Sequence, residues 1–269
     1  MEQTEKYRDK LLKNPEIQEM LEDYSKHKYK YYLLIGTLFI IFFVALIALF
    51  IKLPRLDPED REIFFQFPNT KEKISNTANV LKKYSSSHST YVLILFMYFY
   101  IFLQSFAIPG PAFLSILSGA LWSFKFGLLV VSASASIGAS ICYILSQTFL
   151  TGFVINTWPY AVYTLKAKIT ERKNNLFFYI LFLRFSPLIP NIGVNLGCPI
   201  AGVPLTVFFF GSLVGLIPLN IIHINTGRTL NDISNLGINT KQLLLLFVLG
   251  LVALVPTLMY KKKGKNKNY

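Results

Sequence analysis

Long apolar segments alternate with short polar ones along most of the chain. Residues 33–51 run for 19 positions without a charge, and at about 1.5 Å per residue they cover about 28 Å, which is one bilayer core. The segments 126–150, 203–224 and 242–260 have the same apolar character. The pattern predicts an all-α polytopic membrane protein with about four full transmembrane helices.

A proline-glycine-proline break divides another apolar stretch. Residues 91–108 stop at Pro109-Gly110-Pro111, and the apolar run that follows, 112–124, has only 13 residues. Thirteen residues are too few to cross a bilayer, and the break leaves main-chain groups without helical partners. Such a main chain is tolerated at membrane depth only where protein or water surrounds it. We therefore expect two half-helices that form a re-entrant hairpin.

The stretch 176–198 is broken in the same manner. Arg184 interrupts its apolar run, and Pro187, Pro190 and Asn191 follow within seven residues. A second re-entrant hairpin is expected here. Alternating the membrane crossings makes the two hairpins enter from opposite faces. Broken segments in corresponding positions indicate an inverted repeat with a transport site between its halves.

The distribution of basic residues orients the chain. Five lysines follow the last apolar segment, whereas Arg228 and Lys241 precede it, so the positive-inside rule predicts a cytosolic tail and, by counting crossings, a cytosolic N-terminus. The predicted organisation is a cytosolic arm (1–32, an exposed helix or a disordered segment), a first transmembrane helix (33–51), a polar luminal loop (52–90), a membrane domain with both hairpins (91–235), a last transmembrane helix (242–260) and a basic cytosolic tail (261–269). Within the membrane domain, 151–175 is expected to lie on the cytosolic membrane surface.

Composition excludes several classes of protein. Hydrophobic residues make up 53% of the 269 residues, charged ones only 15%, and 12 of the 14 acidic residues lie at or before Glu72, which is too few carboxylates to solvate a soluble fold. Two cysteines and three histidines give neither a disulfide framework nor a zinc site, and no ATP-binding loop is present. We expect no metal, no cofactor and no enzymatic activity. The net charge of +13 is assigned to lipid headgroups rather than to nucleic acid.

Arg184 is the strongest candidate for function. A charge at bilayer depth costs about 2.5–3.5 kcal/mol on insertion scales, and no apolar segment of this chain supplies a carboxylate to offset it. Its side chain either reaches back to the cytosolic interface, or caps carbonyl groups freed at Pro187 and Pro190, or captures a phosphate that enters the protein. The last two roles are compatible, because a guanidinium matches phosphate geometry.

Five uncharged polar residues lie near breaks or helix ends. Each residue by itself is expected to form a hydrogen bond between helices. Together they would line a neutral polar groove that shelters a zwitterionic headgroup while the acyl chains stay in the bilayer. With Arg184 they form the predicted lipid pathway: Gln104, Asn191, Asn195, Asn220 and His223. Only His223 offers a titratable group for ion coupling.

Small residues at helical spacing predict close contacts between helices. They are Ser134 and Gly138 in one segment, and Gly211 and Gly215 in another. The serines of the first segment would alternatively line a polar path.

The residues from about 98 to 230 resemble the VTT-domain (DedA-like) superfamily, and within it the transmembrane protein 41 group. The resemblance is carried by FLQSFAIPGPAFLSILSGALW (102–122), IGASICYILS (137–146), FLRFSPLIPNIGVNLGCPIAGVPLTVFFFGSLVG (182–215) and INTGRTL (224–230). It implies re-entrant hairpins of opposite orientation and a phospholipid scramblase of the endoplasmic reticulum that works without ATP. It also implies a link to autophagosomes, lipid droplets and lipoprotein export. By motif it places functional weight on Gln104, Pro109, Gly110, Arg184, Pro187, Pro190 and Asn191.

Departures from the family pattern bear on coupling. Proton-dependent bacterial relatives carry an acidic residue where this chain has Gln104, and a second arginine where it has Asn191 and Ile192, which weakens a proton-coupled mechanism here. Pro111 replaces a small or polar residue and stiffens the first hairpin. Lys265 and Lys267 fit an endoplasmic-reticulum retrieval signal.

Three functions are carried forward from the sequence. The first is a scramblase whose partners are phospholipids, with other membrane or autophagy proteins of the endoplasmic reticulum as further partners. The second is an ion-coupled secondary transporter of a lipid-linked or small anionic solute. The third is a membrane scaffold that transports nothing. The oligomeric state does not follow from the sequence.

Overall fold

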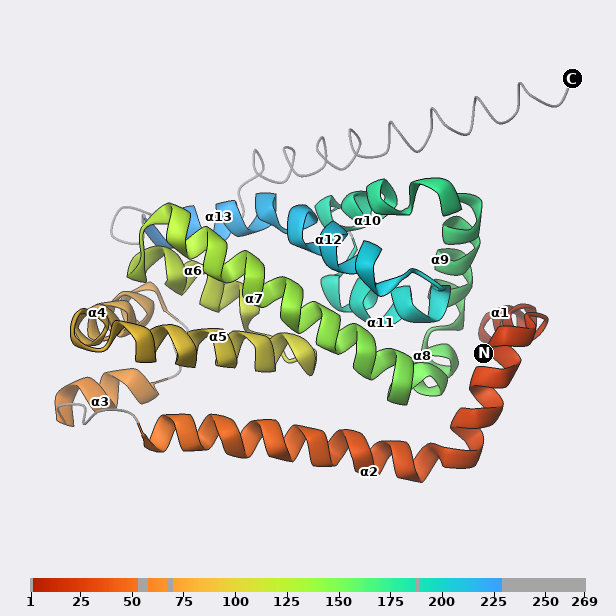
Figure 1. The fold of residues 1–269 in the computed structure, drawn as a ribbon, viewed down its shortest axis with the longest axis horizontal. Helices are drawn as coiled ribbons and strands as arrows, with labels where there is room; N and C mark the ends of the chain where they lie inside the picture. The colour runs from red at the N-terminus through yellow and green to blue at the C-terminus, as the bar shows by residue number, and fades with distance from the viewer. Residues whose placement is uncertain (1, 53–57, 67–69, 187–188, 229–269) are drawn as a thin grey trace, which may run out of the picture. The chain divides into compact units, whose positions relative to one another are not determined.

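The computed structural model describes residues 2–52, 58–66, 70–186 and 189–228, and every regular element in these ranges is a helix (Figure 1). Three helical stretches are long and apolar enough to cross a membrane: Pro15–Ile51, Phe124–Thr157 and Leu205–Arg228. The prediction of an all-α polytopic membrane protein is confirmed. The fourth predicted crossing, 242–260, and the basic tail lie outside the described residues.

Contacts divide the chain into two compact units. Among the described residues, unit 1 comprises 2–39 and 139–215, and unit 2 comprises 40–138 and 216–228. Unit 1 holds α1 (Glu2–Leu12), the first part of α2 (Pro15–Ile51), the end of α7 (Phe124–Leu145), the π-helix η1 (Ser146–Leu150), α8 (Thr151–Thr157), α9 (Pro159–Glu171), the 3₁₀ turn η2 (Lys173–Asn175), α10 (Leu176–Phe185), α11 (Asn191–Ala201) and α12 (Leu205–Gly215). Unit 2 holds the rest of α2 and α7, together with α3 (Pro58–Phe65), α4 (Lys71–Ser87), α5 (Ser89–Ser105), α6 (Pro111–Leu121) and α13 (Ile217–Arg228).

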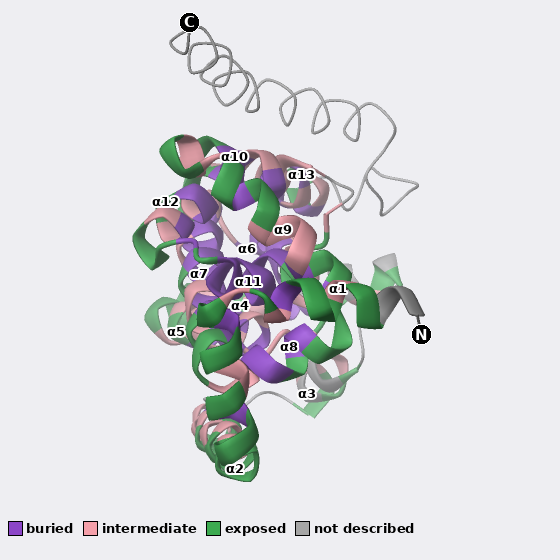
Figure 2. Cartoon of the chain, turned by 90° about the vertical axis from the view of Figure 1, so that its right-hand side faces the viewer, coloured by how far each residue is buried: buried purple, intermediate pink, exposed green. Residues whose placement is uncertain are grey.

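The N-terminal arm is helical and part of it is buried. α2 continues without a break from the polar arm into the apolar segment, whose window is only 6% buried, so Figure 2 shows much of this helix as exposed. In the arm, by contrast, Leu11 and Ile17 are buried, and the ring of Tyr7 lies edge-on to that of Tyr160 with centroids 4.8 Å apart. Within unit 1 the arm therefore packs against α9.

The polar segment between α2 and α5 is largely helical. α4 begins after Thr70, whose hydroxyl accepts a hydrogen bond from the main-chain N–H of Lys73 at 3.3 Å and so caps the helix. Residues 52–90, predicted as a polar loop, thus contain α3 and α4. Pro54 and Pro68 of this segment lie outside the described residues.

The first predicted break separates α5 from α6. Ala107 adopts a left-handed φ of 56°, and Gly110 has a φ of 146° that only glycine adopts readily. Pro111 then occupies the first position of α6, where the missing N–H costs nothing. The helix is therefore interrupted at Pro109-Gly110-Pro111, where the sequence predicts a break.

The second predicted break separates α10 from α11. Ser186 is extended, as expected of a residue before proline, and Pro190 precedes the first residue of α11. Pro187 lies outside the described residues. α11 ends at Gly202, whose φ of 88° closes the helix in the left-handed conformation. That each break forms a re-entrant hairpin, and that the two hairpins enter from opposite faces, stays a prediction.

Glycines set the closest helix contacts in unit 2. α6 packs along α13, and a Cβ added to Gly119 would overlap the carbonyl oxygen of Ile224, just as one added to Gly227 would overlap that of Ile116. These two reciprocal contacts bring the helix backbones into direct contact. Neither glycine is among the packing residues predicted from the sequence. On α7, Gly138 lies against the side chain of Gln104 in the same way.

Replacing Gly119 with leucine is expected to destabilise the chain. The new side chain meets a main-chain carbonyl rather than a side chain that can rotate away, and overpacking a tight interior costs about 1–3 kcal/mol. The apparent Tm of the detergent-solubilised protein should fall by about 2–4 °C for each kcal/mol. Gly36→Leu is the matched control, because nothing lies within 4 Å of a Cβ at that position; equal Tm values for the two variants would contradict the packing.

Candidate functional site

Arg184 occupies the last turn of α10 and is only 3% exposed. Its guanidinium is therefore enclosed by protein rather than exposed to solvent. No acidic side chain in the described part of the chain forms an ion pair with it. The positive charge is held inside unit 1 by neutral groups alone.

Three polar side chains accept hydrogen bonds from this guanidinium. Its Nε and Nη2 donate to the hydroxyl of Ser212 at 3.1 and 2.7 Å, Nη2 also donates to Asn195 Oδ1 at 2.8 Å, and Nη1 donates to Asn191 Oδ1 at 3.2 Å. We call Arg184, Asn191, Asn195 and Ser212 the arginine site. Its members come from α10, α11 and α12, so the site exists only when these three helices are packed together.

An aromatic face and a glycine complete the surroundings. The guanidinium carbon lies 5.0 Å from the ring centroid of the fully buried Phe208, close enough for a cation–π attraction. A Cβ added to Gly215 would come within 2.6 Å of Arg184 Cβ, and one added to Gly211 within 2.7 Å of Ile180 Cγ2. The predicted packing role of these two glycines thus brings α12, and with it Ser212, against α10.

Hydrogen bonds between side chains and carbonyl groups hold α11 in place. The hydroxyl of Tyr143, on α7, donates to the carbonyl of Val203 at 2.5 Å, and that of Ser146, in η1, donates to the carbonyl of Leu196 at 2.8 Å. Each bond ties α11, or the residues just after it, to the end of the long apolar helix. This fixes the helix that carries Asn191 and Asn195.

Unit 2 contains the other three predicted pathway residues. Asn220 is buried on α13 and donates from Nδ2 to the Ser132 hydroxyl at 3.2 Å. His223 follows one turn later and is half-buried, as is Gln104 near the end of α5. These residues pack within unit 2, whereas Asn191 and Asn195 gather around Arg184 in unit 1.

The two units share one local arrangement. In unit 2, a Cβ on Gly138 would meet Gln104 Cβ at 2.6 Å and the carbonyl of Ile101 at 3.2 Å; in unit 1, a Cβ on Gly215 would meet Arg184 Cβ at 2.6 Å and Leu181 at 3.5 Å. In each unit the polar residue and its neighbour three positions earlier lie on the helix before the break. The same contact is thus built twice, once around a neutral side chain and once around a cation.

Sequence reasoning missed two members of these surroundings. Ser212 and Phe208 lie within the stretch 182–215 that carries the family resemblance, but neither was singled out, although Ser212 directly follows Gly211. Ser134, predicted as a packing residue, is fully buried, and its hydroxyl, like that of Ser105, has no hydrogen-bond partner in the described part of the chain. Two polar atoms of unit 2 are thus buried without a bond.

Comparisons with known proteins agree with these features. The family model of the VTT domain matches residues 108–229, which include both breaks and Arg184. The Transmembrane protein 41 homolog of Caenorhabditis elegans is 32% identical over 231 residues, which are 85% of this chain and 94% of that protein. Transmembrane protein 41B is 35% identical in Danio rerio, over 86% of this chain and 82% of that protein, and 34% identical in Homo sapiens, over 82% and 78%. None of the solved structures matches the chain.

Ser212→Ala is expected to lower the apparent Tm of the purified protein. The substitution leaves two N–H groups of a buried cation without an acceptor, and a hydrogen bond to a charged group contributes about 1.5–3 kcal/mol. Ser140→Ala is the matched control, because the Ser140 hydroxyl is buried without a partner among the described residues, so its removal should cost nothing. In an Arg184→Met background the Ser212 substitution should have little effect; an undiminished loss there would show that the serine does not act through Arg184.

Proposed function

Because the chain belongs to the VTT-domain family, and within it to the transmembrane protein 41 group, we propose that this membrane protein is an ATP-independent phospholipid scramblase of the endoplasmic reticulum. It would move phospholipids between leaflets passively and in both directions, as a transport protein rather than an enzyme and without a cofactor. The observation that carries the proposal is the buried arginine site, where neutral groups surround an uncompensated positive charge.

The charge of Arg184 favours a phosphate at this site. Its hydrogen-bond acceptors within the described ranges are amide and hydroxyl oxygens, which orient the guanidinium without neutralising it. Four of its five N–H donors are engaged by partners in the described chain, and one on Nη1 remains for a ligand. In surroundings of low dielectric, a single unneutralised cation attracts a phosphate strongly.

The N-terminus of α11 adds to this attraction. Asn191 is the first residue of that helix and its side chain accepts a bond from Arg184, so the guanidinium lies beside the positive end of the helix dipole. Main-chain N–H groups at a helix N-terminus bind anions readily. The proposed path of a headgroup therefore passes the break between α10 and α11, while the acyl chains remain in the bilayer.

The neutral surroundings of Arg184 also support passive exchange. Coupling to protons or sodium generally uses an acidic side chain inside the membrane, and none pairs with Arg184 among the described residues. Gln104, the counterpart of Arg184 in unit 2, is likewise neutral. Transport would then follow the lipid gradient alone.

The proposed cellular role follows from the family. Redistribution of lipid between leaflets would support the growth of autophagosomes, lipid droplets and lipoproteins, with phospholipids as the primary partners and other membrane proteins of the endoplasmic reticulum as further ones. The charge distribution supports cytosolic N- and C-termini.

Reconstituted protein is expected to expose the inner lipid pool of liposomes. Vesicles that carry a fluorescent phospholipid in both leaflets are treated with a membrane-impermeant quencher; with a scramblase present, the inner pool also loses its fluorescence. Arg184→Gln should slow this loss about tenfold, which corresponds to about 1.4 kcal/mol in the barrier. Glutamine is chosen because Gln104 occupies the equivalent place against Gly138, so the variant removes the charge while preserving the packing.

Two further measurements make the test specific. Arg228→Gln, which removes the charge of an exposed arginine at the end of α13, should leave the rate unchanged. The wild-type rate should not respond to an imposed proton or sodium gradient; a dependence on either would favour a coupled transporter. If the inner lipid pool kept its fluorescence in the presence of the quencher although folded protein was in the vesicles, scrambling would be refuted.

A further inference from the structure

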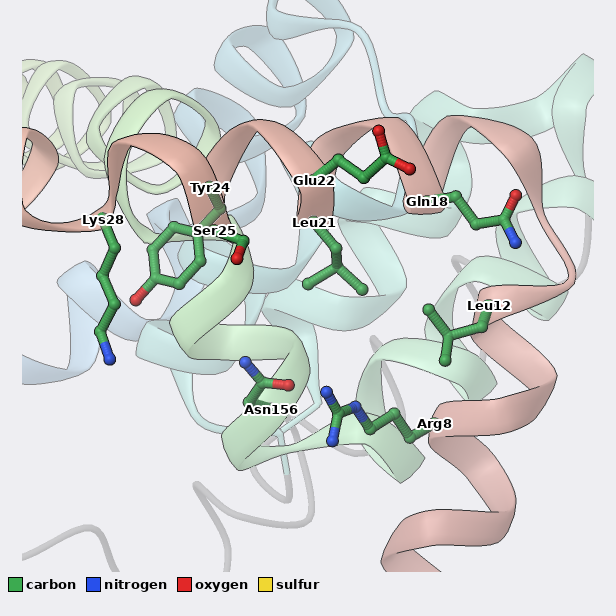
Figure 3. Close-up of a pocket in the computed structure, with 9 residues that line it drawn as sticks. All are labelled: Arg8, Leu12, Gln18, Leu21, Glu22, Tyr24, Ser25, Lys28 and Asn156. Atoms are coloured by element: carbon green, nitrogen blue, oxygen red, sulfur yellow. The ribbon is translucent and has the colours of Figure 1, made fainter.

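A cleft of about 510 Å³ lies in unit 1 between α1, the polar half of α2 and α8 (Figure 3). Its size falls in the range of small-ligand sites, about 300–1,000 Å³. We call it the arm cleft. It is separate from the arginine site, and nothing in the scrambling mechanism uses it.

The walls of the arm cleft are fixed by contacts on either side. Lys166 Nζ of α9 lies 3.2 Å from Glu16 Oε2 at the start of α2, and Gly152 of α8 lies directly beneath the ring of Tyr24. The hydroxyl of Tyr24 in turn shares a hydrogen bond of 2.6 Å with that of Tyr32. These contacts hold the arm against α8 and α9, so the cleft is formed without a ligand.

The lining of the arm cleft combines apolar side chains with two cations, one carboxylate and several hydrogen-bonding groups. Arg8 and Lys28 contribute two cations and Glu22 one carboxylate. In Figure 3 the Arg8 guanidinium and the Asn156 amide point toward each other, and the carboxylate of Glu22, which also lines the cleft, points away from these two groups. A guanidinium, an ammonium and an amide are the donors that bind phosphate oxygens.

The position of the cleft along α2 relates it to the membrane surface. Lys28 precedes the apolar segment by five residues, about 7.5 Å along the helix. Between them Tyr29 is 85% exposed, and Leu33 at the start of the apolar segment is 71% exposed. Exposed tyrosine next to exposed aliphatic residues is typical of the level of lipid headgroups. A phosphate bound beside Lys28 would therefore lie at that level, with the apolar face of α2 available to acyl chains.

We propose that the arm cleft binds a phosphate-bearing headgroup, with Arg8 and Lys28 as its charged contacts and Asn156 as a hydrogen-bond donor. The ligand class is an anionic phospholipid; a free phosphate ester has the same chemistry and is separated from it by experiment. The site is independent of scrambling, because a chain that moved no lipid would still bind at the cleft.

Binding is measured with the full-length chain in detergent, using the fluorescence anisotropy of a labelled short-chain phosphatidic acid. The double variant Arg8→Gln/Lys28→Gln is expected to weaken binding tenfold or more. Lys13→Gln/Lys26→Gln is the matched control: it removes two exposed charges from the same arm but outside the cleft, and it should change the Kd less than twofold. An equal loss in both double variants, or in neither, overturns the proposal.

A second variant keeps the test valid if the first one misfolds. Asn156→Asp removes no cation but places a carboxylate beside Arg8, so repulsion should weaken phosphatidic acid binding several-fold; unchanged binding would also overturn the proposal. Competition identifies the source of the phosphate. Displacement by unlabelled short-chain phosphatidic acid, with none by millimolar inorganic phosphate, supports a lipid ligand, whereas equal displacement by both supports a soluble one.

Scrambling assays on the same variants separate the two proposals. In vesicles of phosphatidylcholine alone, Arg8→Gln/Lys28→Gln should scramble at the wild-type rate, because the cleft is not part of the proposed path. A protein that binds phosphatidic acid but exposes no inner pool would refute the scramblase and leave the arm cleft standing.

Discussion

Unit 1 depends on one constraint, a buried positive charge that no carboxylate of the described residues pairs with. Leaving Arg184 in an apolar interior would cost several kcal/mol if its donors were unpaired. Ser212, Asn191 and Asn195 supply acceptors from two other helices, and Phe208 supplies a ring face. The break after α10, the start of α11 at Asn191 and the close approach of α12 all serve the same requirement, because moving any one of them would leave donors of the cation unsatisfied.

Unit 2 shows that helix packing alone does not require that charge. Gln104 occupies the same position against Gly138 that Arg184 occupies against Gly215, so the architecture is compatible with a neutral side chain. Helix packing therefore does not explain why a cation is buried at this position, since burying it costs free energy. The proposed role in binding an anion would explain why one unit carries arginine. Asn220 and Ser132 show that a polar pair elsewhere needs no charge.

The sequence predicted the features that are set by local chemistry. Prolines and Gly110 restrict the backbone wherever they occur, so the breaks at 109–111 and 187–190 were identifiable, although Pro187 itself lies outside the described residues. The four-residue spacing of Gly211 and Gly215 likewise predicted a contact face. The sequence did not predict features that depend on distant pairing. The ion pair of Glu16 with Lys166 joins positions 150 residues apart, and no local pattern marks it. The sequence alone therefore predicts an exposed helix or a disordered segment for the arm, and not its packing against α9.

Passive transport requires a site that attracts a headgroup yet releases it quickly. A site can conduct only when binding favours entry without preventing exit. Four of the five N–H donors of Arg184 are bonded to neighbouring side chains. The guanidinium therefore keeps its full positive charge but has only one N–H group left for a phosphate. Attraction from a distance is retained, while a tight bidentate complex is prevented. At the arm cleft Arg8 and Lys28 are both exposed, so water and salt screen their charges, but their donors stay available to a phosphate. Under the two proposals, the same anion chemistry would serve binding at one position and rapid passage at the other.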